Sequence, residues 1–218
     1  MSLLTLRDII YSYPGGTSNV LNGINYHFEK GTFYAIVGSS GAGKSTLLGL
    51  LAGLDTPTGG QILFDDEDIA EQGYSHHRKH NISLVFQNYN LIDYLTPLEN
   101  LKLVNAKATN ETLRTMGLDD DHINRNVMKL SGGQQQRVAI GRALVSHAPI
   151  ILADEPTGNL DETTAADIID ILRRAAHQND KCVIVVTHSK QLAKEADVVL
   201  TLKNKLLQQG KKDKAHQM

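Results

Sequence analysis

Apolar residues recur along the chain with two different spacings, which predict a strand-rich beginning followed by a helical middle. The short apolar runs that predict β-strands in the first third lie at residues 2–10, 20–28, 32–37 and 60–65. Turn-forming residues separate these runs, namely Pro14, Gly15 and Gly16 and, further along, Gly59 and Gly60. Successive strands joined by tight turns favour an antiparallel sheet at the start of the chain.

Helical spacing begins after the first third, and the last part of the chain alternates between strands and helices. The segments with helical spacing lie at residues 96–106, 110–118, 132–146 and 162–178. Continuous apolar runs, typical of strands buried on both faces, lie at residues 81–87, 149–154 and 182–188. We therefore expect one α/β domain, residues 1–218, with a mixed sheet covered by helices. Residues 1–87 and 146–218 would form its core, and an inserted helical subdomain would span residues 88–145.

Composition is that of an ordinary soluble protein. The 218 residues are 41% hydrophobic and 21% charged, and the formal net charge of -2 does not indicate a nucleic-acid partner. The single cysteine, Cys182, excludes a disulfide within the chain and is expected to pack in a strand. No targeting signal or membrane-length apolar run is visible, which predicts a cytoplasmic protein or one held at a membrane by a partner. Residues 203–218 are polar and lysine-rich, and we expect a frayed tail, with a lipid-contact patch as the alternative.

The sequence GSSGAGKS, from Gly38 to Ser45, follows an apolar run and precedes a helical one, the context of a phosphate-binding loop. Its glycines allow the backbone to turn N–H groups inward toward phosphate oxygens. The helix that follows adds the positive end of its dipole. Lys44 would reach the β- and γ-phosphates, and the Ser45 hydroxyl could bind Mg²⁺.

An acidic pair ends the apolar run IILADEP and supplies what a phosphate loop needs for hydrolysis. Asp154 would hold Mg²⁺, directly or through water, and Glu155 would polarise the attacking water. The alternative is an acidic pair at a strand end that is merely exposed to solvent. The presence of the phosphate loop favours the catalytic interpretation.

A second candidate for anion binding lies at residues 130–137, sequence LSGGQQQR. Ser131 is suited to cap a helix, and Gly132 and Gly133 allow the backbone a close approach. The alternative is an ordinary capped helix with a flexible start.

The complete set of segments resembles the ATP-binding subunit of ABC transporters, over nearly the whole chain. GSSGAGKST resembles the Walker A motif, IILADEP resembles Walker B, and LSGGQ resembles the ABC signature. VFQNYN is similar to the Q-loop, GNLD to the D-loop and VVTHS to the H-loop, all in the family's order. The resemblance implies a P-loop NTPase (RecA-like) mixed sheet core with an N-terminal antiparallel β subdomain and an inserted α-helical subdomain.

The resemblance also implies an ATPase that forms a homodimer in its ATP-bound state, with ATP and Mg²⁺ as cofactors. Two copies would pair head to tail, and each ATP would lie between Walker A of one copy and the signature of the other. The residues that would bind the nucleotide are Gly38, Ser39, Ser40, Gly41, Ala42, Gly43, Lys44, Ser45 and Thr46 in Walker A and Ser131, Gly132, Gly133 and Gln134 in the signature.

Single residues outside these two loops also receive roles from the resemblance. Gln87 would sense Mg²⁺ and the γ-phosphate, His188 would contact the γ-phosphate, and Asp161 would organise the dimer seam. Tyr13 would stack on adenine, with Tyr11 as the other candidate. The implied catalytic residues are Glu155, His188, Gln87 and Lys44, and the implied metal ligands are Ser45, Gln87 and Asp154.

Within the family, the chain looks most similar to the subfamily that serves lipoprotein release, macrolide and peptide export, and cell-division signalling. A transmembrane permease would then hold it at the cytoplasmic side of the membrane, and export of peptide, antibiotic or lipoprotein is implied. The residues implied to receive a permease helix are Tyr89, Leu91, Leu95 and Leu98; the alternative is that they merely pack the helical subdomain. The chain departs from the family in a short segment after Gln87, in Lys205 where a turn glycine is common, and in Gly141 where alanine is frequent.

Other functions remain as alternatives to a transport ATPase. An ABC ATPase could signal through a membrane partner to cell-wall or division machinery without transport. A chromosome or repair ATPase would need a long coiled coil, and a translation factor would need two cassettes; the sequence contains neither. A plain phosphate-loop kinase would leave LSGGQ unexplained.

Overall fold

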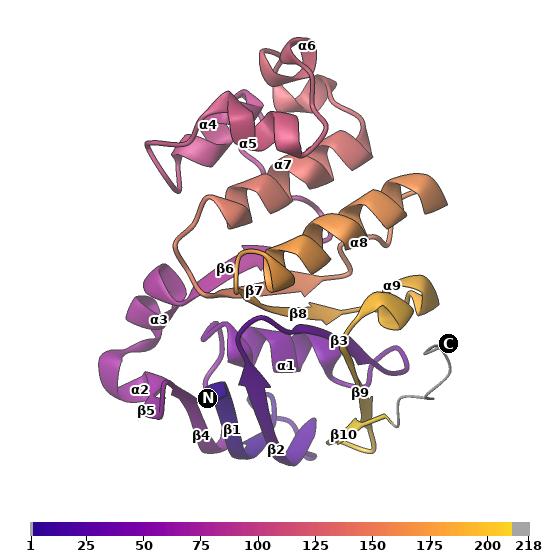
Figure 1. Ribbon diagram of the computed structural model, residues 1–218. Coiled ribbons are helices and arrows are strands. Elements are labelled where there is room, and N and C mark those ends of the chain that lie inside the picture. Colours follow the sequence, from indigo (N-terminus) through magenta and orange to yellow (C-terminus); the bar gives the residue numbers. More distant parts are fainter. Residues whose placement is uncertain (1, 211–218) are drawn as a thin grey trace.

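The computed structural model describes residues 2–210, which form two β-sheets with a helix between them and further helices above (Figure 1). The first sheet is four-stranded and antiparallel, in the order β2-β1-β4-β5. Its strands are β1 (Ser2–Tyr11), β2 (Leu21–Glu29), β4 (Gly59–Phe64) and β5 (Glu67–Asp68). The predicted antiparallel sheet at the start of the chain is therefore confirmed.

The second sheet is six-stranded, in the order β10-β9-β3-β8-β7-β6, and only β10 runs antiparallel to its neighbour. Its strands are β3 (Phe33–Val37), β6 (Ile82–Val85), β7 (Ile150–Asp154), β8 (Cys182–Val186), β9 (Val198–Lys203) and β10 (Leu206–Gln209). The apolar run at residues 32–37 thus belongs to this sheet and not with the other early strands. Four of the five residues of β3 are buried, as expected for a parallel strand covered on both faces.

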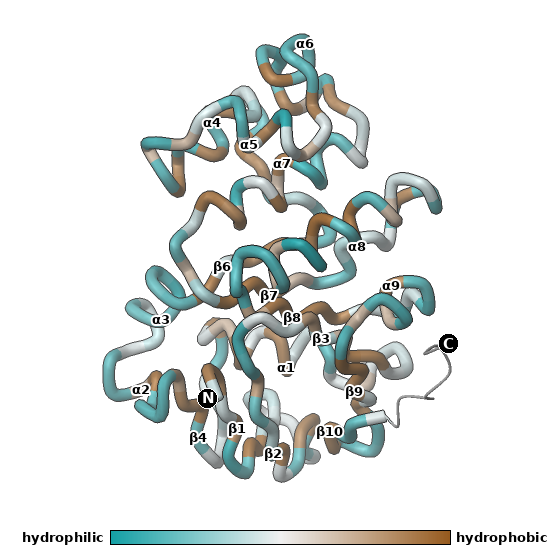
Figure 2. Tube along the Cα trace, in the orientation of Figure 1, coloured by the Kyte–Doolittle hydropathy of each residue, from teal (hydrophilic) through white to brown (hydrophobic). Residues whose placement is uncertain are grey.

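Alternate residues of the six-stranded sheet point into two separate cores. Tyr34 and Ile36 pack with helix α1 (Lys44–Leu51) and with the first sheet. Ala35 and Val185 pack on the other side with α7 (Gly132–Leu144), α8 (Glu162–His177) and α9 (Lys190–Glu195). The strands between these layers are the most apolar part of the chain trace (Figure 2). Cys182 is fully buried in β8, and burial raises the pKa of its thiol.

The remaining short helices lie in two places. Between β6 and β7 the chain forms α4 (Pro97–Lys102), α5 (Asn110–Thr115), α6 (Asp120–Ile123), the 3₁₀ helix η1 (Val127–Lys129) and α7, within the segment predicted to be helical. Between β5 and β6 lie α2 (Ile69–Gln72) and α3 (Tyr74–His80), which sequence reasoning missed. The sequence of α3, YSHHRKH, contains almost no apolar residues, so it lacks the spacing that marks a helix.

The two glycines at positions 59 and 60 do not form a turn, so that prediction was wrong. Gly59 pairs with Ile10 and begins β4. Gly60 has φ of 82°, and a Cβ atom there would lie 2.4 Å from the carbonyl oxygens of Arg7 and Asp8. Glycine is needed at position 60 because the neighbouring strand passes too close for a side chain, at an irregularity in the β1–β4 pairing.

The part of the predicted tail that the structure describes is not frayed. Residues 203–209 contribute to the β9–β10 hairpin, in which Leu206 pairs with Lys203, so the tail prediction was wrong for this part. Residues 211–218 lie outside the described residues. The turn consists of Asn204 and Lys205, with φ of 51° and 66°. These angles fit the two-residue turn that favours Asn-Gly, and the hairpin keeps its register despite the lysine.

We expect Lys205→Gly to stabilise the protein by about 0.5–1 kcal/mol, because a left-handed backbone costs a non-glycine residue about 1 kcal/mol or more. Chemical denaturation would measure the change in unfolding free energy. Lys203→Gly, in the extended strand β9, is the matched control and should destabilise. Equal destabilisation by both variants would contradict strain at Lys205.

Gly141 occupies a position in α7 where alanine would also fit. A Cβ atom there would meet the side chains of Met116 and Leu101 at 3.7 and 3.8 Å, which is ordinary contact. The glycine is therefore not required by packing, and its cost to the helix is about 1 kcal/mol.

Candidate functional site

The phosphate loop, residues 38–45, connects the end of β3 to the start of α1. Gly41 and Gly43 have φ of 75° and 99°, angles that favour glycine. A Cβ atom at Gly43 would lie 2.9 Å from Cγ1 of Val20. No side chain caps the N-terminus of α1, so its first N–H groups are available to an anion.

Lys44 lies folded over this loop. Its Nζ donates to the carbonyl oxygens of Gly38 and Ser39, at 3.0 and 3.1 Å. The ammonium group is therefore held at the loop backbone, where a phosphate bound by the loop would be within its reach.

Asp154 and Ser45 come together at the end of β7, although they are far apart in the sequence. Burial raises the pKa of Asp154, with a smaller contribution from the charge of Glu155. A hydrogen bond with Ser45 and the charge of Lys44 act in the opposite direction. A half-buried carboxylate beside a hydroxyl is a suitable pair of oxygen ligands for Mg²⁺, which usually takes few protein ligands and several phosphate or water oxygens. Among residues 2–210 no group of three or more His, Cys, Asp and Glu could hold a metal by itself.

Glu155 is held in an unusual backbone conformation next to His188. Its φ is 46°, and its backbone N–H donates to the carbonyl oxygen of Val186 at 2.9 Å. Non-glycine residues with positive φ are uncommon and recur at functional sites. One carboxylate oxygen, Oε1, lies 2.9 Å from Nδ1 of His188, and the other, Oε2, accepts the backbone N–H of His188 at 3.2 Å.

Burial distinguishes the two partners of this pair. The side chain of Glu155 is 15% exposed, whereas that of His188 is 70% exposed. Thr187, which sequence reasoning did not single out, donates its hydroxyl to Oε2 of Glu155 at 3.2 Å. The carboxylate is therefore fixed in direction, and the imidazole next to it is open to solvent.

Gln87 and Tyr13 lie at the margins of this group. A Cβ atom on Gly158 would be 3.4 Å from Nε2 of Gln87, so this exposed amide lies against the loop that follows Glu155. The hydroxyl of Tyr13 is 2.7 Å from Oγ1 of Thr46 in α1. Tyr13 is 51% exposed and Tyr11 only 5%, so Tyr13 is the tyrosine whose ring is accessible to a ligand.

The signature segment, residues 130–137, begins α7 with a capping box. The hydroxyl of Ser131 accepts the backbone N–H of Gln134, and the side chain of Gln134 accepts the backbone N–H of Ser131. A Cβ atom on Gly132 would lie 2.7 Å from the hydroxyl of Tyr89, and one on Gly133 would lie 2.5 Å from Cγ2 of Thr164. The sequence suggested phosphate binding or a flexible helix start as the reason for these glycines, and the structure adds two close neighbours within the chain that leave little room for a side chain.

Thr164 connects the signature segment to Asp161, the N-cap of α8. Asp161 accepts the backbone N–H of Thr164 at 3.0 Å and its hydroxyl at 2.7 Å. These hydrogen bonds lower the pKa of Asp161. The methyl group of Thr164 lies against Gly133 at the same time. The first turns of α7 and α8 are thus in direct contact.

The predicted site residues therefore form two groups. Walker A, Walker B, Gln87, His188 and Tyr13 belong to one, and the signature residues with Asp161 belong to the other. α1 covers one face of the core sheet, whereas α7 and α8 cover the other face (Figure 1). Within one chain, the two helix N-termini suited to anions are thus on opposite sides of the sheet.

We expect Gly133→Ala to disturb the contact between α7 and α8, because its methyl group would clash with Cγ2 of Thr164. Thr164→Ser removes that carbon atom and keeps the hydroxyl that Asp161 accepts. The single variant should lose about 1–3 kcal/mol of unfolding free energy, and Thr164→Ser in the same chain should restore most of it. Thermal and chemical denaturation of the four proteins of this cycle would test the prediction, and additive effects would contradict it.

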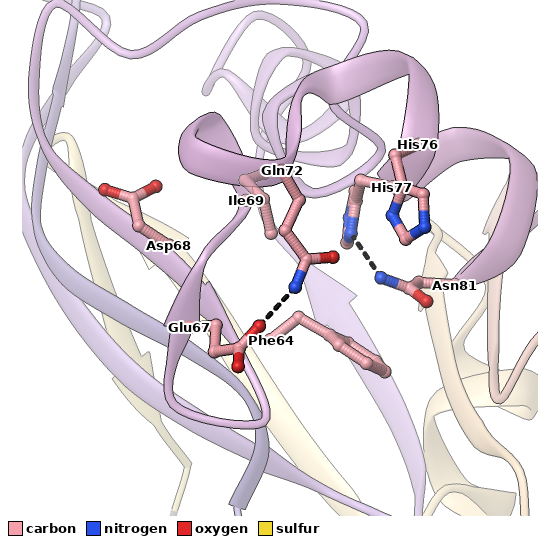
Figure 3. Close-up of a pocket in the computed structure, with 8 residues that line it drawn as sticks. All are labelled: Phe64, Glu67, Asp68, Ile69, Gln72, His76, His77 and Asn81. Carbon is pink, nitrogen blue, oxygen red and sulfur yellow. Dashed lines mark hydrogen bonds between the residues drawn. The ribbon is translucent and has the colours of Figure 1, made fainter.

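A small cavity of about 10 Å³ lies away from this site, between β4, α2 and α3 (Figure 3). Glu67 accepts a hydrogen bond from Gln72 at its side, and the ring of His77 contacts Asn81 and the carbonyl oxygen of Leu51. Burial lowers the pKa of His77. The cavity has room for about one water molecule, so it is a feature of packing and not a nucleotide site.

Three functional candidates were missed or assigned differently by sequence reasoning. Thr164 comes shortly after Asp161 of the D-loop segment, and Thr187 comes directly before His188 of the H-loop segment. Their nearness to these two residues in the sequence was the available signal. Tyr89 was considered only for partner docking, whereas its hydroxyl contacts the signature segment. Contacts between distant segments leave no pattern in a single sequence.

Comparison with known proteins shows what the chain is similar to. The family model described as ABC transporter matches residues 21–158. The uncharacterized ABC transporter ATP-binding protein YclH of Bacillus subtilis is 42% identical, over 93% of this chain and 94% of that protein. The lipoprotein-releasing system ATP-binding protein LolD 1 of Rhodopseudomonas palustris is 38% identical, over 91% and 95%. The macrolide export ATP-binding/permease protein MacB of Brucella melitensis is 39% identical over 93% of this chain, which spans 33% of that protein.

A solved structure extends the similarity to three dimensions. The dimeric post-hydrolysis state of the ATP-binding cassette MJ0796, from Methanocaldococcus jannaschii, is bound to ADP and Pi. It superposes with a TM-score of 0.83 at 34% identity, over 95% of this chain and 98% of that one. This similarity confirms the predicted fold class. In residues 2–210, no helix is both long enough and apolar enough to cross a membrane.

Proposed function

This chain belongs to the ABC transporter family, and we propose that it is the ATP-hydrolysing subunit that drives a membrane permease. It binds ATP and hydrolyses it to ADP and phosphate. The observation that carries the proposal is the grouping of Lys44, Ser45, Asp154, Glu155 and His188 at the ends of neighbouring parallel strands. This edge of an open α/β sheet is where such proteins bind their ligands.

Each of these residues has a distinct task in hydrolysis. The loop N–H groups and Lys44 would hold the phosphate chain, and Ser45, Asp154 and Gln87 would hold Mg²⁺. Mg²⁺, when bound, would neutralise charge on the β- and γ-phosphates. Glu155 would accept a proton from the attacking water, which it can do because Thr187 and His188 fix the direction of its carboxylate.

His188 would serve both the carboxylate and the nucleotide. Its Nδ1 is engaged with Glu155, so Nε2 is the ring atom left to reach the γ-phosphate. The ring is mostly exposed, which leaves it accessible to a nucleotide in the loop.

We propose a head-to-tail homodimer as the complete enzyme. In one chain, the helix that follows the phosphate loop and the helix that begins with the signature segment pack on opposite faces of the core sheet, which supports a site completed by a second copy. A second copy, rotated by half a turn, would bring its Ser131 and Gly133 to the nucleotide of the first. MJ0796, with a TM-score of 0.83, is a dimer in its own structure.

The permease would dock on the helical side of β6. A groove of about 210 Å³ lies there, and its lining includes Arg78, Leu84, Val104 and Arg142. Exposed apolar side chains of the adjoining segment are Ile92, Tyr94, Leu103 and Val104. These differ from the four residues suggested by the sequence: Leu91 and Leu98 pack on the core, Tyr89 contacts the signature segment, and Leu95 is half-buried. Large exposed apolar groups favour an interaction surface.

Export or extrusion of a peptide, antibiotic or lipoprotein is the transport class we propose, since MacB and LolD 1 carry those names. The second candidate is signalling through a membrane partner to cell-wall or division machinery. Both would place the chain peripherally at the cytoplasmic side of the membrane, in contact with a permease-like protein and with no nucleic acid.

Affinity capture from the native host would test this proposal. A tagged Glu155→Gln chain is purified from membranes solubilised with ATP, and the proteins that accompany it are identified by mass spectrometry. A permease with a large external domain supports export or release, whereas a division or cell-wall protein supports signalling. Tyr94→Ser in the same chain should reduce the capture, and Leu206→Ser, an exposed apolar residue on the hairpin, should not. Recovery of no membrane protein would contradict the proposal.

A further inference from the structure

We infer that His122 is a positioning residue for the first turn of α7. The ring Nε2 of His122, in α6, lies 2.8 Å from the side-chain Nε2 of Gln134. The other amide atom of Gln134, Oε1, accepts the backbone N–H of Ser131 at 2.9 Å. The imidazole is thus connected through one side chain to Ser131, which is proposed to meet the nucleotide of the partner copy.

The hydrogen bonds of Gln134 determine which nitrogen of His122 carries the proton. Oε1 of Gln134 already accepts from Ser131, so the amide atom that faces His122 is an NH₂ group, which can only donate. Nε2 of His122 must therefore accept, and the neutral ring carries its proton on Nδ1. Nδ1 lies 2.7 Å from Oδ1 of Asp119, which is an ion-pair distance without the direction of a hydrogen bond.

A second ring proton would reverse the contact between His122 and Gln134. The protonated ring would present Nε2–H to the NH₂ group of Gln134, so two donors would face each other. Gln134 would then have to turn its amide, and the N–H of Ser131 would lose its acceptor. The geometry at the start of α7 would therefore depend on the charge of His122.

Other charged groups on the packed helices mostly have contacts of their own. Their pairs are Arg114 with Glu111 and Asp120, Arg125 with Asp121, and Arg137 with Asp167. On α4, Glu99 accepts the backbone N–H of Thr96, and Lys102 lies in the last turn. Asp119 is the acidic group in contact with the His122 ring.

The inference rests on the proposed function, because it gives the contact between His122 and Gln134 a role in positioning Ser131 of the signature segment. His122→Gln keeps an acceptor for Gln134 in the form of Oε1 but cannot change charge. At pH 8 we expect this variant to hydrolyse ATP like the wild type. Between pH 8 and pH 6 the ratio of wild-type to variant turnover should fall about threefold, the size of one lost hydrogen bond.

Two further variants complete the test. His122→Ala removes the acceptor and should lower turnover about threefold at both pH values. His147→Gln replaces an exposed histidine elsewhere and should follow the wild type at every pH. A role of His122 in packing alone would lower turnover in the Ala and Gln variants equally, without any difference in pH profile.

Nuclear magnetic resonance of the full chain provides a readout independent of hydrolysis. In a pH titration, the backbone amide of Ser131 and the side-chain amide of Gln134 should shift together with the His122 ring. Neither amide should shift in this way in His122→Gln. The inference would be overturned if the wild type and His122→Gln had parallel pH profiles of turnover. It would also be overturned if the amide signals of Ser131 and Gln134 did not shift with the His122 ring. If the wild type hydrolysed no ATP, the proposed function would fail, while the amide titration would still decide the role of His122.

Discussion

Glu155→Gln is expected to abolish ATP hydrolysis and to trap an ATP-bound dimer. Glutamine has the same size and can still occupy the place beside Thr187 and His188, but it cannot accept the proton of the attacking water. Loss of a general base typically lowers turnover by about 10²–10⁴-fold. The nucleotide would then remain between the two copies, because its hydrolysis is what would release them.

Phosphate release and a sizing column with Mg-ATP would measure both parts of this prediction. Glu71→Gln, an exposed residue in α2, is the matched control and should behave like the wild type. A Glu155→Gln chain that hydrolyses ATP normally would remove Glu155 from the mechanism. A variant that stays monomeric with Mg-ATP would contradict the head-to-tail dimer. Adding the captured permease would show whether dimer formation requires that partner.

Lys44→Ala is expected to lose most of its nucleotide affinity. Lys44 is the cation that lies on the phosphate loop, and its Nζ contacts the carbonyl oxygens of Gly38 and Ser39. A charge-assisted hydrogen bond is worth about 1.5–3 kcal/mol, which corresponds to a loss of affinity of about 10- to 150-fold. The loss should appear as a larger dissociation constant for ATP and not only as slower turnover.

Calorimetric titration with ATP would measure this constant, and circular dichroism would show that the variant folds. Lys30→Ala removes an exposed lysine from the loop before β3 and is the control for net charge. Unchanged ATP binding by Lys44→Ala would refute the role assigned to Lys44. Equal losses in both variants would indicate a general effect of charge.

Local features of the site were predictable from the sequence. The phosphate loop depends on residues that are neighbours in the chain: an apolar strand, glycines with positive φ, and a helix that starts at Lys44. The capping box of Ser131 and Gln134 spans only three residues. Such features are determined by short-range backbone geometry, so a motif and its context suffice to indicate them.

Contacts between distant segments required the tertiary structure. Gly133 meets Thr164, Glu155 meets His188, and His122 meets Gln134 because separate helices and strands pack together. The Gly59-Gly60 pair was interpreted as a turn, because the carbonyl groups that exclude a side chain at Gly60 belong to another strand and leave no signal in the sequence. Helix α3 was missed because its residues are mostly polar, so the sequence shows no helical spacing of apolar residues there.

The sequence by itself therefore indicated the family, most of the strands and the longer helices, and the residues that are proposed to bind phosphate. The phosphate-binding residues lie in short contiguous segments whose conformation depends on nearby residues. The tertiary structure alone decided that α1 and α7 lie on opposite faces of the core sheet, and which side chains orient Glu155 and Gln134. These relations arise from the burial of apolar faces on both sides of β3 and β8, a property of the packed chain as a whole.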